Sequence, residues 1–190
     1  MTNYREQQPP RARRRSRGAI ATDFLTGRAG ASEFVHAFDG ERYAGVNVIV
    51  ADRDAVCYTS NRGDPPSSLA PGVYGLSNAS LDTPWSKLTR TRGALAALLE
   101  KDEPTPARLF ELLADRKPAP AAETGGSELP FGLPRALTAP FIVADDYGTR
   151  CSTVVMRGAA GDTLFHERRF APDGSATGES AFEFRAGATL

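Results

Sequence analysis

The stretch from Cys57 to Lys87 constrains the fold more than any other part of this chain. Its first residues alternate as a short strand does, a loop rich in Pro, Ser and Gly follows over 62–72, and a short apolar run covers 73–77. Pro84 then stands where proline is tolerated, near the start of a helix. The stretch therefore predicts a strand, a polar loop, a second strand and a helix in succession.

The same signals along the rest of the chain predict a mixed fold. Apolar residues at helical spacing predict helices over 18–27 and 85–100 and short helices after Ser32 and after Pro104-Thr105-Pro106. The expected strands cover 45–51, 55–60, 73–77, 141–144, 149–157, 163–170 and 181–184. Strands on both sides of a pair of consecutive helices favour an α+β fold with a largely antiparallel sheet. We predict one domain over 1–190, with a mobile surface loop over 117–138 where Pro, Ala and Gly are frequent.

Composition argues against several classes of protein. The 23 basic and 23 acidic residues leave no net charge, so nothing global favours nucleic acid or a membrane surface. The arginine-rich segment 1–17 favours a loop before the first helix over a nucleic-acid arm. No apolar run approaches the roughly 18 residues of a transmembrane helix. Because Cys57 and Cys151 do not make a disulfide scaffold, we expect a cytoplasmic protein. The neutral net charge leads us to expect no nucleic-acid partner.

Short motifs in a fixed order resemble a known family over nearly the whole chain. They are Thr2–Glu6, Ser16–Gly18 with Phe24-Leu25, Tyr43–Asn47, Ser60–Arg62, Leu69–Gly72, Tyr74–Asn78, Leu81–Trp85 and Tyr147–Thr153. Together they resemble the NRDE family, also called the transport-and-Golgi-organisation protein 2 family. In that family the chain is expected to begin with Met-Cys and to carry Asn-Arg-Asp-Glu soon after, and this sequence has neither.

The resemblance implies an N-terminal-nucleophile-hydrolase-like αββα sandwich. In such enzymes an N-terminal Cys, Ser or Thr attacks an amide, and its own α-amine, with a pKa of roughly 7.7–8.0, takes the proton. Here Thr2 follows Met1, and Thr2 falls on the LTNxR-like motif of the family instead of its first strand. We therefore expect an N-terminally incomplete sandwich that lacks the first strands and the nucleophile.

Two residues resemble members of a catalytic set. Asn78 resembles the asparagine that cysteine-type amidases place near the oxyanion, where a side-chain N–H contributes roughly 3–4 kcal/mol. The same residue suits the cap of a turn. Arg150 resembles a late pocket arginine that pairs with a carboxylate, and it equally suits a structural salt bridge. Both alternatives stay open for both residues.

The candidate ligand-binding residues are Ser60, Asn61, Arg62 and Ser77. The first three end a predicted strand, which is where binding sites often lie and where turns also begin. Trp85 is predicted to be a buried indole at a helix start. Both cysteines are predicted to be small buried hydrophobic residues. No metal site is predicted, because neither histidine belongs to a Cys/His cluster.

Functions from different classes follow from the resemblance. The first is a small-ligand-handling protein in the cytoplasm, with haem as a candidate cargo and no cofactor required. Haem needs an apolar slot and an axial ligand, for which the candidates are the tyrosines and His36, His166, Cys57 and Cys151. The alternative is an amidohydrolase that is inactive in this chain because the N-terminal Cys is absent. A third is a partial domain that self-associates through an open sheet edge.

Overall fold

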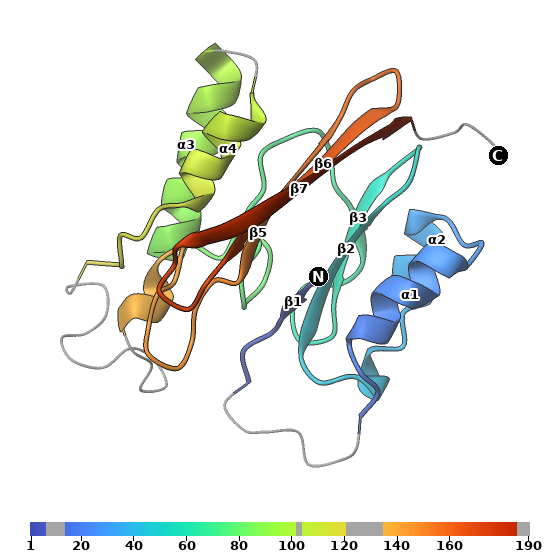
Figure 1. The fold of residues 1–190 in the computed structure, drawn as a ribbon. Helices are drawn as coiled ribbons and strands as arrows, with labels where there is room; N and C mark the ends of the chain where they lie inside the picture. Colours follow the sequence, from blue (N-terminus) through green and yellow to red (C-terminus); the bar gives the residue numbers. More distant parts are fainter. Residues whose placement is uncertain (7–13, 102–103, 121–134, 186–190) are drawn as a thin grey trace. The chain divides into compact units, whose positions relative to one another are not determined.

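The fold is described from a computed structural model of the chain, over residues 1–6, 14–101, 104–120 and 135–185. Its α-helices are α1 (Gly18–Thr26), α2 (Ala31–His36), α3 (Ser86–Lys101) and α4 (Pro106–Leu113), and its short 3-10 turns are η1 (Gly40–Arg42) and η3 (Arg135–Thr138). Its strands are β1 (Thr2–Asn3), β2 (Val46–Ala51), β3 (Val56–Ser60), β4 (Ser67–Ser68), β5 (Cys151–Arg157), β6 (Asp162–Phe170) and β7 (Ala176–Arg185). Helices and two antiparallel sheets confirm the predicted α+β class (Figure 1).

The chain divides into two compact units, which are described separately. The first unit is Met1–Leu88 and the second is Thr89–Leu190. The single domain over 1–190 stays a prediction, and much of the predicted loop over 117–138 lies outside the described residues.

The first unit is built on a four-stranded antiparallel sheet in the order β1-β2-β3-β4. The hairpin of β2 and β3 forms its centre and sets Asn47 opposite Ser60. On the other side of β2, the two-residue strand β1 sets Asn3 opposite Val46. In this unit α1 and α2 lie beside the β2–β3 hairpin (Figure 1). The end of β1, the start of β2 and the end of β3 lie side by side and carry polar residues. A candidate site is therefore sought at this end of the sheet.

Alternate residues of β2 supply the core of the first unit. Val46, Val48 and Val50 are buried together with Ile20 of α1 and Val35 of α2. Each fully buried aliphatic side chain stabilises the fold by about 1.5–3 kcal/mol. Cys57 of β3 belongs to the same cluster, so its predicted burial is confirmed.

Helix α2 begins at Ala31, one residue before the predicted cap Ser32. Its first N–H is taken instead by Asp52, whose carboxylate accepts from Ala31 at 2.6 Å. Asp52 lies in the turn between β2 and β3 and also accepts the N–H groups of Asp54 and Ala55. These three backbone donors lower the pKa of Asp52. A carboxylate brought in by tertiary structure thus satisfies a helix end that local sequence assigned to serine.

The predicted strand over 73–77 is wrong. The segment 75–85 carries no regular secondary structure and closes on itself, because Asp82 accepts the Gly75 N–H at 2.7 Å and donates its own N–H back to the Gly75 carbonyl. Asp82 adopts a φ of 57°, which aspartate tolerates more readily than most residues. The hydrogen bond to the Asp82 side chain therefore takes the place of the backbone pairing with a neighbouring strand that the apolar run predicted.

The second unit is built on the antiparallel sheet β5-β6-β7. The predicted turn over 158–162 joins β5 to β6, with a φ of 88° at Gly161. The expected strand over 141–144 amounts to one bridge between Val143 and Gly148, and the expected strand over 181–184 is part of the longer β7.

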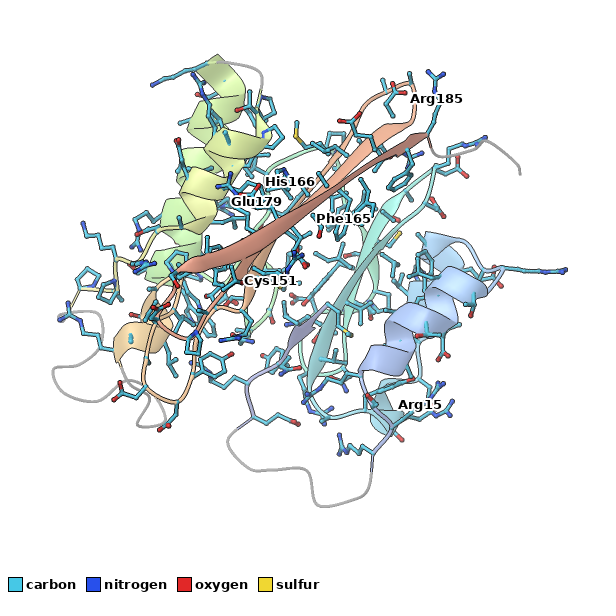
Figure 2. All side chains as sticks on the ribbon, in the orientation of Figure 1. Arg15, Cys151, Phe165, His166, Glu179 and Arg185 are labelled. Carbon is cyan, nitrogen blue, oxygen red and sulfur yellow. The ribbon has the colours of Figure 1, made fainter. Side chains whose placement is uncertain are left out.

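The two faces of the second sheet differ. Val154 of β5 is buried, and Phe110 of α4 packs edge-on against His166 with 4.9 Å between ring centroids. His166 lies 3.0 Å from Glu179 on the neighbouring strand (Figure 2). Cys151 is exposed, contrary to the prediction that it is buried. The reason is strand alternation, which puts Cys151 on the face opposite to Val154.

Candidate functional site

The candidate site lies in the first unit, where β1 and β3 end and β2 begins. Residues from three distant parts of the chain meet there: the β1 segment, the β2–β3 hairpin and the segment 75–85. Five of the six predicted site residues belong to this region, namely Ser60, Asn61, Arg62, Ser77 and Asn78.

Asn47 is the centre of this region and was missed by the sequence analysis. It is fully buried in β2, accepts the Tyr58 hydroxyl proton at 3.1 Å and donates to the Ala79 carbonyl at 2.9 Å and to Thr2 Oγ1 at 3.2 Å. Burial raises the pKa of Tyr58, so this hydroxyl stays protonated and can donate. The available signal was one amide in an otherwise apolar strand, because a buried amide must find partners.

Ser77 and Asn78 are tied to β1. The Asn78 side-chain amide donates to the Asn3 carbonyl at 2.8 Å, and the Asn78 carbonyl accepts the Arg5 N–H at 2.8 Å. Thr2 Oγ1 donates to the Ser77 carbonyl at 2.5 Å. Among the residues that the structure describes, the Ser77 hydroxyl has only a long contact, of 3.4 Å to Asn78 Oδ1. These bonds give Asn78 a structural role, and its role at an oxyanion stays a prediction.

Asn61 acts as a four-way structural link just after β3. Its Oδ1 accepts the Val46 N–H at 2.8 Å, and its Nδ2 donates to the carbonyls of Gly40, Tyr43 and Ala44 at 2.8–3.2 Å. The neighbouring Ser60 hydroxyl makes a similar local turn, accepting the N–H groups of residues 62 and 63. Both side chains satisfy backbone groups that would otherwise be left without partners.

Arg62 pairs with Glu6. Its Nε lies 3.0 Å from one carboxylate oxygen, and the other oxygen accepts the Gly45 N–H at 2.8 Å. Burial alone would raise the pKa of Glu6, but the bonds from Gly45 and Arg62 outweigh it and the net shift is downward. The carboxylate is therefore ionised at neutral pH and holds the segment after β1 on the start of β2.

The segment 75–85 is called the tethered loop here, because Asn47 of β2 and the β1 segment hold it by hydrogen bonds. The sequence analysis also missed a cluster of three side chains at the end of this loop. The Arg5 guanidinium carbon lies 5.1 Å from the centre of the Trp85 ring, and Lys87 Nζ lies 5.7 Å from it. Burial lowers the pKa of Arg5, and burial together with the charge of Arg5 lowers the pKa of Lys87. Trp85 is half-buried, not buried as predicted, because it stands just before α3 and outside the apolar core cluster of the first unit.

Arg150 lies in the second unit, so the structure does not place it against the other candidates. It is exposed just before β5, and no side-chain bond or ion pair of Arg150 occurs among the described residues. Among the candidate haem ligands of the first unit, His36 Nδ1 lies 2.8 Å from the Ser32 carbonyl and Cys57 is buried. His166 belongs to the second unit and contacts Glu179 there.

Two further kinds of feature are absent from the part of the chain that the structure describes. Over 1–6, 14–101, 104–120 and 135–185, no three or more His, Cys, Asp and Glu side chains gather as a metal site would require. No helix in the same ranges has the length and apolar character needed to cross a bilayer.

The sequence is similar to known proteins. A family model described as "Transport and Golgi organisation 2" matches residues 1–172. The "Transport and Golgi organization 2 homolog" of Mus musculus is 35% identical over 185 residues. The "Transport and Golgi organization protein 2 homolog" is 36% identical over 186 residues in Bos taurus and 34% over 184 residues in Homo sapiens. Each comparison covers 88% of this chain and 66% of the relative.

Proposed function

Because the chain belongs to the Transport and Golgi organisation 2 family, which confirms the resemblance to the NRDE family, we propose that it handles a small-molecule ligand at the candidate site of its first unit. The chain spans 66% of the length of these curated relatives, and their names refer to transport and Golgi organisation. A ligand-handling role is compatible with those names.

The observation that carries the proposal is the tethered loop over 75–85. It has no regular secondary structure, yet Asn47 holds its middle, Asn78 joins it to β1 and Asp82 closes it. Irregular segments held rigidly on a sheet are where binding groups commonly lie, because the order is already present before the ligand arrives. Within the described ranges the Ser77 hydroxyl makes only a long contact, to Asn78, so it has capacity for a ligand.

Haem is the candidate cargo that the family resemblance names. Its propionates are carboxylates, and Arg5 and Lys87 beside the loop offer charges of the right sign. The axial ligand is not assigned to any residue. Haem is therefore the first ligand to test. The same charges would also suit other ligands that carry a carboxylate.

The test has two arms. The protein is purified without denaturation, small molecules are extracted from it and identified by mass spectrometry, and the emptied protein is titrated with haem by visible absorption. We expect a stoichiometric co-purifying molecule or saturable haem binding. Absence of both would contradict the proposed function.

Two serine variants provide the matched control. Ser77→Ala is expected to weaken binding about fivefold, the equivalent of one hydrogen bond of about 1 kcal/mol. Ser67→Ala removes an exposed hydroxyl of β4 and is expected to leave binding unchanged. Equal affinities for the two variants would move the ligand away from the tethered loop.

The amidohydrolase alternative and the N-terminal-nucleophile sandwich are finer proposals. They rest on the family resemblance and on the placement of Asn78 beside β1. Turnover of a small amide by the chain as given, lost on Asn78→Ala, would favour the enzyme over the ligand handler.

Self-association and a cytoplasmic location also stay proposals. Edge strands present unpaired backbone groups, and β5 and β7 are the two edges of the second sheet. Light scattering after size exclusion tests self-association, and a cooperative melt from a monomer would contradict it.

A further inference from the structure

Two cations share one aromatic ring in the first unit. Arg5 and Lys87 each lie within 6 Å of the Trp85 ring centre, the range in which the electrons of an indole attract a cation. Arg5 follows β1 and Lys87 lies in the first turn of α3, so two distant segments of the chain bring these charges together.

The arrangement has an excess of positive charge. Among the residues that the structure describes, neither Arg5 nor Lys87 forms an ion pair with a carboxylate, whereas Arg62 nearby is paired with Glu6. Both cations are half-buried, and like charges held this close repel each other. The lowered pKa of Lys87 reflects burial first and the charge of Arg5 second. An indole alone offsets only part of this cost, because the ring is neutral and attracts a cation only through its quadrupole.

The cluster is held in place before any ligand binds. The backbone N–H of Arg5 donates to the Asn78 carbonyl at 2.8 Å, and the backbone N–H of Trp85 donates to the Thr83 carbonyl at 2.7 Å. In the first turn of α3, Leu88 is 7% exposed and lies so close to Gly75 that a Cβ added to Gly75 would be 2.4 Å from Leu88 Cδ2. The start of α3 is thus fixed against the tethered loop.

We propose that Arg5, Trp85 and Lys87 form a binding site for the oxyanion group, carboxylate or phosphate, of a small organic ligand. An oxyanion offers both cations the counter-charge that they lack among the described residues, and the guanidinium of Arg5 suits two-point binding of such a group. The partly positive N-terminus of α3 acts in the same direction. This inference rests on the proposed function and deepens it by giving the ligand a charge.

Trp85 reports directly on the site, because it is the one tryptophan of the chain. Its fluorescence is followed during titration with inorganic phosphate and, separately, with acetate, while sodium chloride keeps the ionic strength constant. We expect saturation by at least one of the two in the millimolar range, which corresponds to about −4 kcal/mol. Saturation by phosphate alone, acetate alone or both identifies the accepted oxyanion.

Charge-removing variants locate the binding. Lys87→Gln and Arg5→Gln are each expected to weaken binding at least about tenfold, the effect of losing one charged hydrogen-bond donor. Lys101→Gln removes the same charge from the exposed far end of α3 and is expected to bind as the parent does. Lys87→Arg keeps the positive charge and is expected to bind the anion as the parent does, unlike Lys87→Gln. Circular dichroism verifies that each variant is folded.

Two outcomes would overturn the inference. One is an emission that responds to neither anion or responds equally to sodium chloride. The other is equal weakening by Lys101→Gln and Lys87→Gln. Extraction or haem titration can fail while this titration saturates, so failure of the proposed function and failure of the oxyanion site are distinguishable.

Discussion

The buried Tyr58 hydroxyl donates to the side-chain oxygen of Asn47 across 3.1 Å, and it also accepts the Leu81 N–H at 3.3 Å. This pair joins the β2–β3 hairpin to the tethered loop of the candidate site. Both residues are at most 1% exposed, so water cannot replace either partner.

Tyr58→Phe is therefore expected to lower the free energy of unfolding by about 1–2 kcal/mol, because it leaves the Asn47 oxygen and the Leu81 N–H without this partner. Urea denaturation measures the change. Tyr74→Phe removes an exposed hydroxyl that donates to the Ala70 carbonyl and is expected to cost less than about 0.5 kcal/mol. Equal costs for the two variants would contradict the structural role of the Asn47–Tyr58 pair.

Gly75→Ala is expected to destabilise the first unit by about 1–3 kcal/mol, since the new methyl would lie 2.4 Å from Leu88 Cδ2. Gly75→Ala combined with Leu88→Ala should recover part of the overpacking cost, as a double-mutant cycle would show. Gly93→Ala is the control: nothing lies within 4 Å of its added Cβ inside α3, and it is expected to stabilise by about 0.5–1 kcal/mol. A neutral Gly75→Ala would refute the close approach.

Asn61→Ala is expected to lower the free energy of unfolding by about 2–3 kcal/mol, because four backbone groups lose a partner at once. Asn61→Asp keeps the acceptor for Val46 but sets a carboxylate against three carbonyl oxygens, so it should also destabilise. Asn3→Ala removes an exposed amide and serves as the control. If Asn61→Ala kept full stability but lost ligand binding, Asn61 would be a binding residue and not a structural one.

Glu6 should make the stability of the first unit depend on pH. Its pKa is lowered in the folded protein, so its contribution is present above the unfolded pKa of about 4.3 and is lost as the pH falls through the folded pKa. Glu6→Gln is expected to lower stability by about 1 kcal/mol at neutral pH and by progressively less in acid. Urea midpoints between about pH 3 and about pH 7 measure this, and parallel pH profiles for parent and variant would contradict it.

Much of the fold was predictable because it depends on local pattern. The alternating valines of β2, the turn after them and the apolar spacing of α1 and α3 lie within short windows, and they predicted the hairpin and the helices. The segment 73–77 shows the limit: its apolar run suggested a strand, but Asp82 closed the segment into a loop. Cys151 shows a second limit of prediction from sequence, because the alternation of residues along a strand does not say which face of that strand is covered.

By itself, the sequence determined the α+β class and the family, and it singled out Ser60–Arg62 and Ser77-Asn78 as candidate site residues, because periodicity and motifs are properties of neighbouring residues. Only the tertiary structure decided what those residues do. Thr2 and Ser77 are 75 positions apart and share a hydrogen bond, and Arg5 reaches Trp85 through the same pairing of segments. Burial and charge depend on which distant residues fold against each other, so they made Asn61 a structural link and left two cations on one indole.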